Sequence, residues 1–115
     1  MKKYPFYNNQ KIKIVHSVSE GLSFDNSYCF DTILLSEVIE HITLFEELKI
    51  LDSIRANCSP NCRFVVSTPL GYMPEGTHIR GFSRSDFIYN LNTFYGKPKN
   101  IYYTDIQQIA FGYLR

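Results

Sequence analysis

The sequence predicts an α/β domain, in which parallel strands are joined by helical crossovers and an antiparallel hairpin closes the sheet. Two short apolar runs, FDTILLS (30–36) and CRFVVSTP (62–69), are typical of strands covered on both faces of a parallel sheet. A segment with helical leucine spacing separates them. Two aromatic-rich stretches joined by a very tight turn, 100–105 and 107–115, predict the hairpin.

The first expected element is a strand over KIKIVHSV (11–18), because this segment alternates and is rich in β-branched residues. The following segment, 19–29, gathers Gly, Ser, Asp and Asn and is expected to be a loop. The buried-type strand 30–36 comes next. It runs directly into the polar stretch SEVIEHI, 36–42.

A helix is expected after this stretch, capped by Thr43, with Glu46 completing a capping box. One helical face is then predicted at Leu44, Leu48, Leu51 and Ile54 or Arg55. The tripeptide SPN (59–61) is expected to turn the chain into the strand 62–69.

An irregular loop is predicted over 70–81, which holds three glycines and a proline. Ser83 with Asp86 forms a second capping pattern at the start of another helix. The apolar stripe expected on that helix consists of Phe87, Ile88, Leu91 and Phe94. Gly96 and Pro98 are expected to end it.

Composition limits the classes of function. A chain of 115 residues with 44% apolar and 20% charged residues is expected to fold as one globular domain. The net charge of +1 does not indicate nucleic acid as a partner. No apolar run reaches the length of a membrane span and no signal peptide is evident, so a cytoplasmic location with three reduced cysteines is expected.

Several motifs in order resemble the C-terminal half of class I S-adenosylmethionine-dependent methyltransferases. These are FDTILLSEVIEHI, then a helix, SPNCRFVVSTP, and HIRGFSRSDF. The family shows an FD-x-V strand running into E-V-I/L-E-H, a strand ending in S-T-P, and an H-x-R-x-F-S/T segment opening a helix. The resemblance implies a partial Rossmann-like methyltransferase sheet, the cofactor S-adenosylmethionine and an unknown methyl acceptor.

The chain departs from the family pattern at the cofactor site. The family's first motif is a strand followed by a glycine-rich turn, yet no two glycines here stand one residue apart. We therefore expect residues 1–10 to be an N-terminal extension and residues 11–115 to be a truncated methyltransferase-like domain with an incomplete cofactor site. In such a domain the 11–18 strand is expected to pair with 31–35, or a complementing chain or second copy to supply the missing strands.

The candidate site residues follow the expected strands, because ligands of α/β sheets bind beyond the carboxyl ends of the strands. The resemblance implies cofactor contacts for Ser36 and Glu37. It implies substrate contacts for His41, Tyr72, His78 and Arg80. The plainer interpretation of SEVIEHI is a set of polar residues at a helix start.

A sharper alternative also comes from resemblance. In small-RNA 3′-terminal 2′-O-methyltransferases an E-x-x-E-H motif joins a later His to hold a divalent cation. The carried-over ligands are Glu37, Glu40, His41 and His78. Three hypotheses therefore stand: a methyltransferase that is incomplete as a lone chain, a non-catalytic methyltransferase remnant acting as an interaction module, and a metal-dependent RNA 2′-O-methyltransferase fragment.

Overall fold

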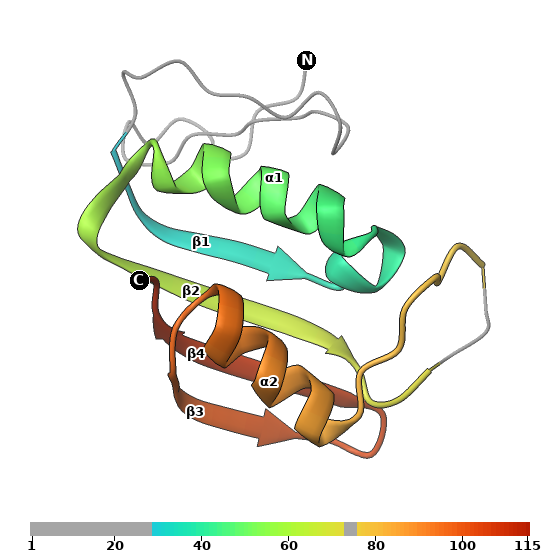
Figure 1. Ribbon diagram of the computed structural model, residues 1–115. Coiled ribbons are helices and arrows are strands. Elements are labelled where there is room, and N and C mark those ends of the chain that lie inside the picture. The colour runs from blue at the N-terminus through green and yellow to red at the C-terminus, as the bar shows by residue number, and fades with distance from the viewer. Residues whose placement is uncertain (1–28, 73–75) are drawn as a thin grey trace, which may run out of the picture.

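The computed structural model describes residues 29–72 and 76–115 (Figure 1). The extension 1–10 and the strand expected over 11–18 lie outside the described residues. The elements, in chain order, are β1 (Phe30–Ser36), the 3₁₀ helix η3 (Ile39–His41), α1 (Leu44–Arg55), β2 (Cys58–Pro69), α2 (Arg84–Phe94), β3 (Pro98–Tyr103) and β4 (Gln107–Tyr113). None of the helices among these residues is long and apolar enough to cross a membrane.

The four strands form one mixed sheet in the order β1-β2-β4-β3. β1 and β2 pair in parallel, and α1 connects them, whereas β4 is antiparallel to both of its neighbours. α2 connects β2 to β3, and the β3–β4 hairpin closes the sheet (Figure 1). The predicted α/β class, with helical crossovers and a C-terminal antiparallel hairpin, is therefore confirmed.

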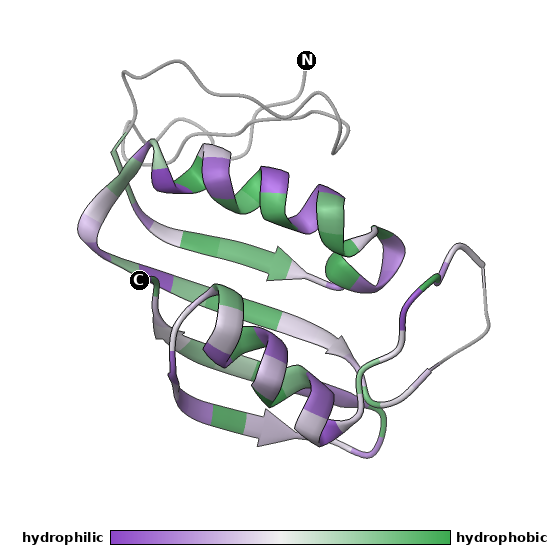
Figure 2. Ribbon diagram, in the orientation of Figure 1, coloured by the Kyte–Doolittle hydropathy of each residue, from purple (hydrophilic) through white to green (hydrophobic). Residues whose placement is uncertain are grey.

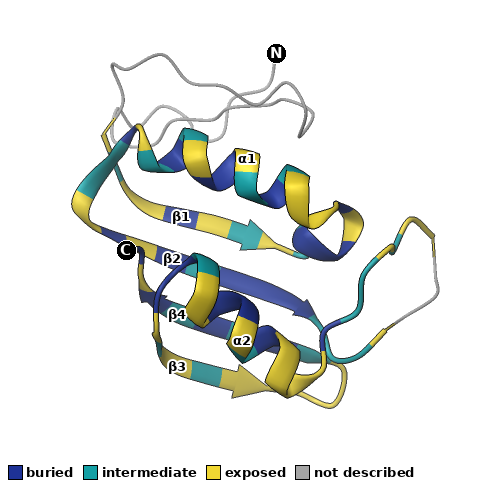
Figure 3. Cartoon of the chain, viewed as in Figure 1, coloured by how far each residue is buried: buried dark blue, intermediate teal, exposed yellow. Residues whose placement is uncertain are grey.

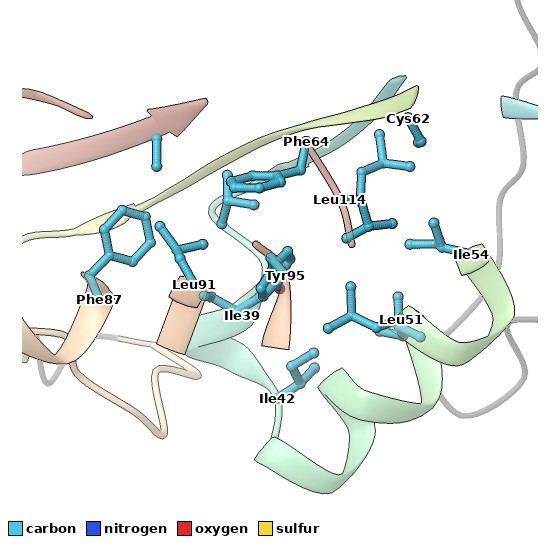
Figure 4. Packing of buried hydrophobic residues seen from close by; sticks show 14 of the residues in the cluster. Ile39, Ile42, Leu51, Ile54, Cys62, Phe64, Phe87, Leu91, Tyr95 and Leu114 are labelled. Atoms are coloured by element: carbon cyan, nitrogen blue, oxygen red, sulfur yellow. The ribbon is translucent and has the colours of Figure 1, made fainter. Parts of the chain in front are cut away.

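The core lies between the sheet and the two helices, which cover the same face (Figure 1). Phe64 of β2 is fully buried there, and Leu51 of α1 and Leu91 of α2 belong to the same cluster beneath the sheet (Figure 4). Each large apolar side chain buried in this way stabilises the fold by about 1.5–3 kcal/mol. The helices are therefore held to the sheet mainly by apolar packing.

The start of α1 is formed as the capping pattern predicts. The Thr43 hydroxyl accepts a hydrogen bond from the Glu46 backbone N–H (3.1 Å), and the Glu46 carboxylate accepts one from the Thr43 N–H (3.0 Å). The predicted face is correct at Leu51 and Ile54 but wrong at Leu44, which is exposed. The buried stripe consists of Glu47, Ile50, Leu51 and Ile54. It includes a charged residue, so hydropathy alone could not place it.

The prediction that β1 is covered on both faces is wrong. Only Ile33 is buried in this strand, and 67% of the Leu34 surface is exposed. The middle of β1 is hydrophobic in Figure 2, yet most of the strand is exposed or intermediate in Figure 3. Among the described residues β1 is an edge strand, and Leu34 points to the face opposite that of its neighbour Ile33, which belongs to the core.

The turn predicted at 59–61 is also wrong, because β2 already begins at Cys58. The pairing changes from Phe30↔Cys58 to Thr32↔Arg63, so β2 advances by five residues while β1 advances by two. The extra β2 residues form an irregularity in the ladder rather than a separate turn. Cys58 and Cys62 therefore belong to one strand.

The second helix and the hairpin agree with the predictions, with shifted boundaries. The Ser83 hydroxyl accepts a hydrogen bond from the Asp86 N–H at 3.1 Å, which caps α2. Phe87 and Leu91 are buried, whereas the flanking stripe positions at 88 and 94 are half-buried. The first hairpin strand, Pro98–Tyr103, begins and ends two residues earlier than predicted. The second, Gln107–Tyr113, begins as predicted and ends two residues earlier.

Candidate functional site

The parallel strands β1 and β2 end at the same edge of the sheet, and SEVIEHI begins at that edge. The Glu37 N–H donates to the Ser67 carbonyl at 3.0 Å, and the hydroxyls of Ser36 and Ser67 lie 3.3 Å apart. Ligands of α/β sheets bind at this edge. The candidate residues are therefore placed where the strand order predicts a site.

Glu37 turns the chain sharply as it leaves β1. Its φ of 55° lies in the left-handed region, which non-glycine residues seldom adopt. This conformation directs its carboxylate along the sheet edge, where it accepts hydrogen bonds from the Ser67 hydroxyl (3.3 Å) and the Gln107 side-chain amide. Glu37 is thus engaged with β2 and β4.

Glu40 is the most unusual residue of the site. It lies in η3 and is only 2% exposed, yet neither carboxylate oxygen has a hydrogen-bond partner among the described residues. Burial raises the pKa of this carboxyl above 4.5, and the nearby Glu37 charge raises it further. Burying a carboxylate without a partner is costly, so this group requires a neutralising proton or a cation.

Two imidazoles lie beside the Glu40 carboxylate. Glu40 Oε2 and His41 Nε2 are 3.6 Å apart, too long for a hydrogen bond but within ion-pair distance when His41 is protonated. The His41 and His78 rings have centroids 4.5 Å apart. One ligand atom from each of the three residues lies within 4.8 Å of the others. Glu37, the fourth ligand suggested by resemblance, is not part of this group.

The cluster is open to solvent on one side. About a third of the His41 side chain (35%) is exposed, and His78 is half-buried. His41 Nδ1 forms a hydrogen bond with the Thr77 hydroxyl at 2.9 Å, which orients the ring. The imidazoles are therefore accessible to a ligand from solvent, whereas the Glu40 carboxylate is buried.

The other two predicted substrate residues differ in their surroundings. Tyr72 is exposed, and its hydroxyl donates to the His78 carbonyl at 3.4 Å, so it lies beside the cluster. The Arg80 guanidinium forms an ion pair with Glu47 at 2.7 Å and lies 4.8 Å from the Phe82 ring centroid. The substrate-binding roles of both residues stay predictions.

Three residues of the site were missed by the sequence predictions. Thr77 forms a hydrogen bond with His41, Gln107 donates one to Glu37, and Glu47 forms an ion pair with Arg80. Thr77 stands next to the predicted His78, which is a weak local signal. Gln107 and Glu47 lie 70 and 33 residues from their partners, so no local pattern could have identified them.

One carboxylate and two imidazoles are ligands that suit manganese, zinc, iron and similar divalent cations. A carboxylate with no partner is also what a cation site has before it is loaded, because the ion supplies the missing neutralising charge. The cluster therefore offers three side chains that could hold a divalent cation.

No protein-family model and no curated protein sequence matches the chain. Among solved structures, the pyocyanin biosynthetic protein PhzM, a methyltransferase, is similar with a TM-score of 0.58 and 15% sequence identity. The match covers 76% of this chain, which spans only 31% of the PhzM chain. At this identity the likeness shows the fold alone: the chain has a methyltransferase-like fold.

Proposed function

We propose that this chain carries the acceptor side of an S-adenosylmethionine-dependent methyltransferase, and that Glu40, His41 and His78 hold a divalent cation there. The fold is methyltransferase-like. The observation that carries the cation is the buried Glu40 carboxylate, which lacks a hydrogen-bond partner and lies beside two imidazoles. The methyl acceptor is a molecule with an oxygen that can reach the cation.

The three side chains would have different roles in cation binding because they differ in exposure. The buried Glu40 would supply the negative charge, and the imidazoles of His41 and His78, which are partly exposed, would be accessible from solvent. A cation bound there would orient an acceptor oxygen and lower the pKa of its proton. The resemblance to small-RNA methyltransferases makes the terminal ribose of RNA one candidate acceptor.

The described residues do not form a complete methyl-donor pocket. Ser36 and Glu37 are the proposed donor contacts, but both Glu37 oxygens already accept hydrogen bonds from Ser67 and Gln107. No glycine-rich turn follows a strand within the described ranges. Methyl transfer depends on holding the donor and acceptor in line, so further residues, from this chain or a complementing one, are needed for activity.

Manganese titration of the full chain tests the cation site. A cation at 100 times its Kd stabilises a fold by about 2.7 kcal/mol, which raises the melting temperature by several degrees. We expect this shift in the wild type, its loss in Glu40→Gln and His78→Ala, and its retention in Asp52→Asn, which removes an exposed carboxylate from α1. An equal shift in all four proteins would exclude the proposed site.

The alternative function, a non-catalytic interaction module, is favoured by the open face of the sheet. Leu34, Val65 and Phe111 form a row across β1, β2 and β4, on the face away from the described helices. Self-association through this face would cover Leu34. A stable dimer in sedimentation experiments, together with no heat on titration with S-adenosylmethionine, would favour this alternative over a methyltransferase.

A further inference from the structure

A buried ion pair lies next to the candidate cation site. Glu47, on the core face of α1, is 1% exposed, and three donors satisfy its carboxylate. They are the Arg80 guanidinium (2.7 Å), the Asn90 side-chain amide (3.0 Å) and the Tyr95 hydroxyl (2.6 Å). The Glu47 carboxylate is therefore satisfied by hydrogen bonds, whereas the Glu40 carboxylate, seven residues earlier, has no hydrogen-bond partner among the described residues.

Arg80 joins this network to the cluster through its main chain. The backbone N–H groups of Ile79 and Arg80 both donate to the Glu40 carbonyl, at 2.9 and 3.1 Å. Arg80 is thus held at one end by Glu47 in α1 and at the other by Glu40 in η3. His78 stands two residues before Arg80, and its ring lies against His41.

The segment that carries His78 has few apolar anchors of its own. Ile79 is exposed, and the residues from Gly76 to Gly81 are exposed or half-buried. Ordering each residue of such a segment costs conformational entropy. If the segment is ordered before the cation binds, the cation does not have to supply that free energy.

We propose that the Glu47–Arg80 ion pair positions His78 against Glu40 and His41, and so sets the cation affinity of the site. The affinity part of this inference rests on the proposed function, whereas the positioning part does not. Arg80 acts here as a positioning residue that does not touch the cation. Partners that orient metal ligands in this way typically contribute 10–100-fold to affinity.

Manganese affinity, measured from the electron paramagnetic resonance of the free ion, tests the proposal on the full chain. We expect Arg80→Ala to weaken binding by roughly tenfold or more, and Arg80→Lys, which keeps the charge, to restore part of the loss. Arg84→Ala is the matched control, because Arg84 stacks on Tyr103 at 4.3 Å and is exposed. Unchanged affinity in folded Arg80→Ala would overturn the proposal.

A second measurement needs no cation. In the wild type, nuclear Overhauser effects are expected between the His41 and His78 rings, whose centroids lie 4.5 Å apart. They should disappear in Arg80→Ala and persist in Arg84→Ala. If Arg80→Ala does not fold, Arg80→Lys takes its place, and we expect its ring contacts to be weaker than those of the wild type. Ring contacts and manganese affinity equal to those of the wild type would overturn the proposal.

The two measurements separate the possible failures. If manganese does not bind the wild type but the ring contacts depend on Arg80, the cation site fails while the positioning stands. If His78→Ala abolishes binding and Arg80→Ala does not, the positioning fails while the cation site stands.

Discussion

Tyr95→Phe is the sharpest test of the buried network. The Tyr95 hydroxyl donates to Glu47 at 2.6 Å, and the ring is fully buried against Phe64. Burial and the Glu47 charge raise the pKa of this phenol above its ordinary range, so it stays a donor throughout the pH range in which the protein folds. The substitution removes the donor and keeps the ring.

The expected loss follows from the partners that remain. A hydrogen bond to a charged acceptor contributes about 1.5–3 kcal/mol, and Glu47 would keep its bonds from Asn90 and Arg80. We therefore expect a loss near the lower end, about 1.5–2 kcal/mol. For a domain of this size that lowers the melting temperature by roughly 6–16 °C.

Equilibrium urea unfolding, followed by circular dichroism, measures this loss. Tyr89→Phe is the control, because Tyr89 is 70% exposed on α2, the helix that ends just before Tyr95, and the substitution should leave stability unchanged. In a Glu47→Gln background the charged acceptor is gone, so Tyr95→Phe should cost less there. A loss below about 0.5 kcal/mol in the wild-type background would refute the role assigned to this bond.

Three further predictions test other parts of the fold. Burial raises the pKa of the Cys62 thiol from 9.0 to about 12, so the free energy of unfolding should fall as pH rises above 9.0. Iodoacetamide at pH 8, with mass spectrometry as the readout, should label the exposed Cys29 but not Cys62, and equal labelling rates would contradict this. Gly81→Ala would place a Cβ 2.5 Å from the Tyr72 Cβ and should lower the free energy of unfolding by about 1–3 kcal/mol, measured by thermal unfolding. An unchanged melting temperature would show that the segments carrying Gly81 and Tyr72 separate freely. Leu34→Lys, on the open sheet face, should change stability by less than about 0.5 kcal/mol and reduce any self-association seen by sedimentation, and a loss above 1 kcal/mol would mean that Leu34 is covered.

The predictions from sequence were most accurate where local chemistry decides the structure. Thr43 and Ser83 cap their helices because each hydroxyl bonds a backbone N–H three residues ahead, which the sequence alone specifies. Within residues 29–72 and 76–115 the order of strands and helices was correct for the same reason, since periodicity and turn residues are local. The placement of SEVIEHI at the carboxyl end of a strand followed from that order.

The errors arose where distant residues decide the structure. Glu47 is buried because Arg80, Asn90 and Tyr95 converge on it from far along the chain. Leu34 is exposed because no described element covers its face of β1. Hydropathy alone predicts an exposed Glu47 and a buried Leu34, which is the opposite of what the structure shows. A local pattern therefore predicts both residues wrongly.

The E-x-x-E-H spacing leaves open whether one carboxylate or two would bind the proposed cation. The left-handed conformation of Glu37 directs its carboxylate toward Ser67 and Gln107, whereas η3 directs Glu40 toward the imidazoles. A site with three ligands therefore predicts that Glu37→Gln keeps manganese affinity within about threefold of wild type, since it removes only a nearby charge. Glu40→Gln, by contrast, should abolish binding. Equal loss in the two variants would mean that Glu37 leaves the sheet edge to join the cation, and the four-ligand arrangement implied by resemblance would then be correct.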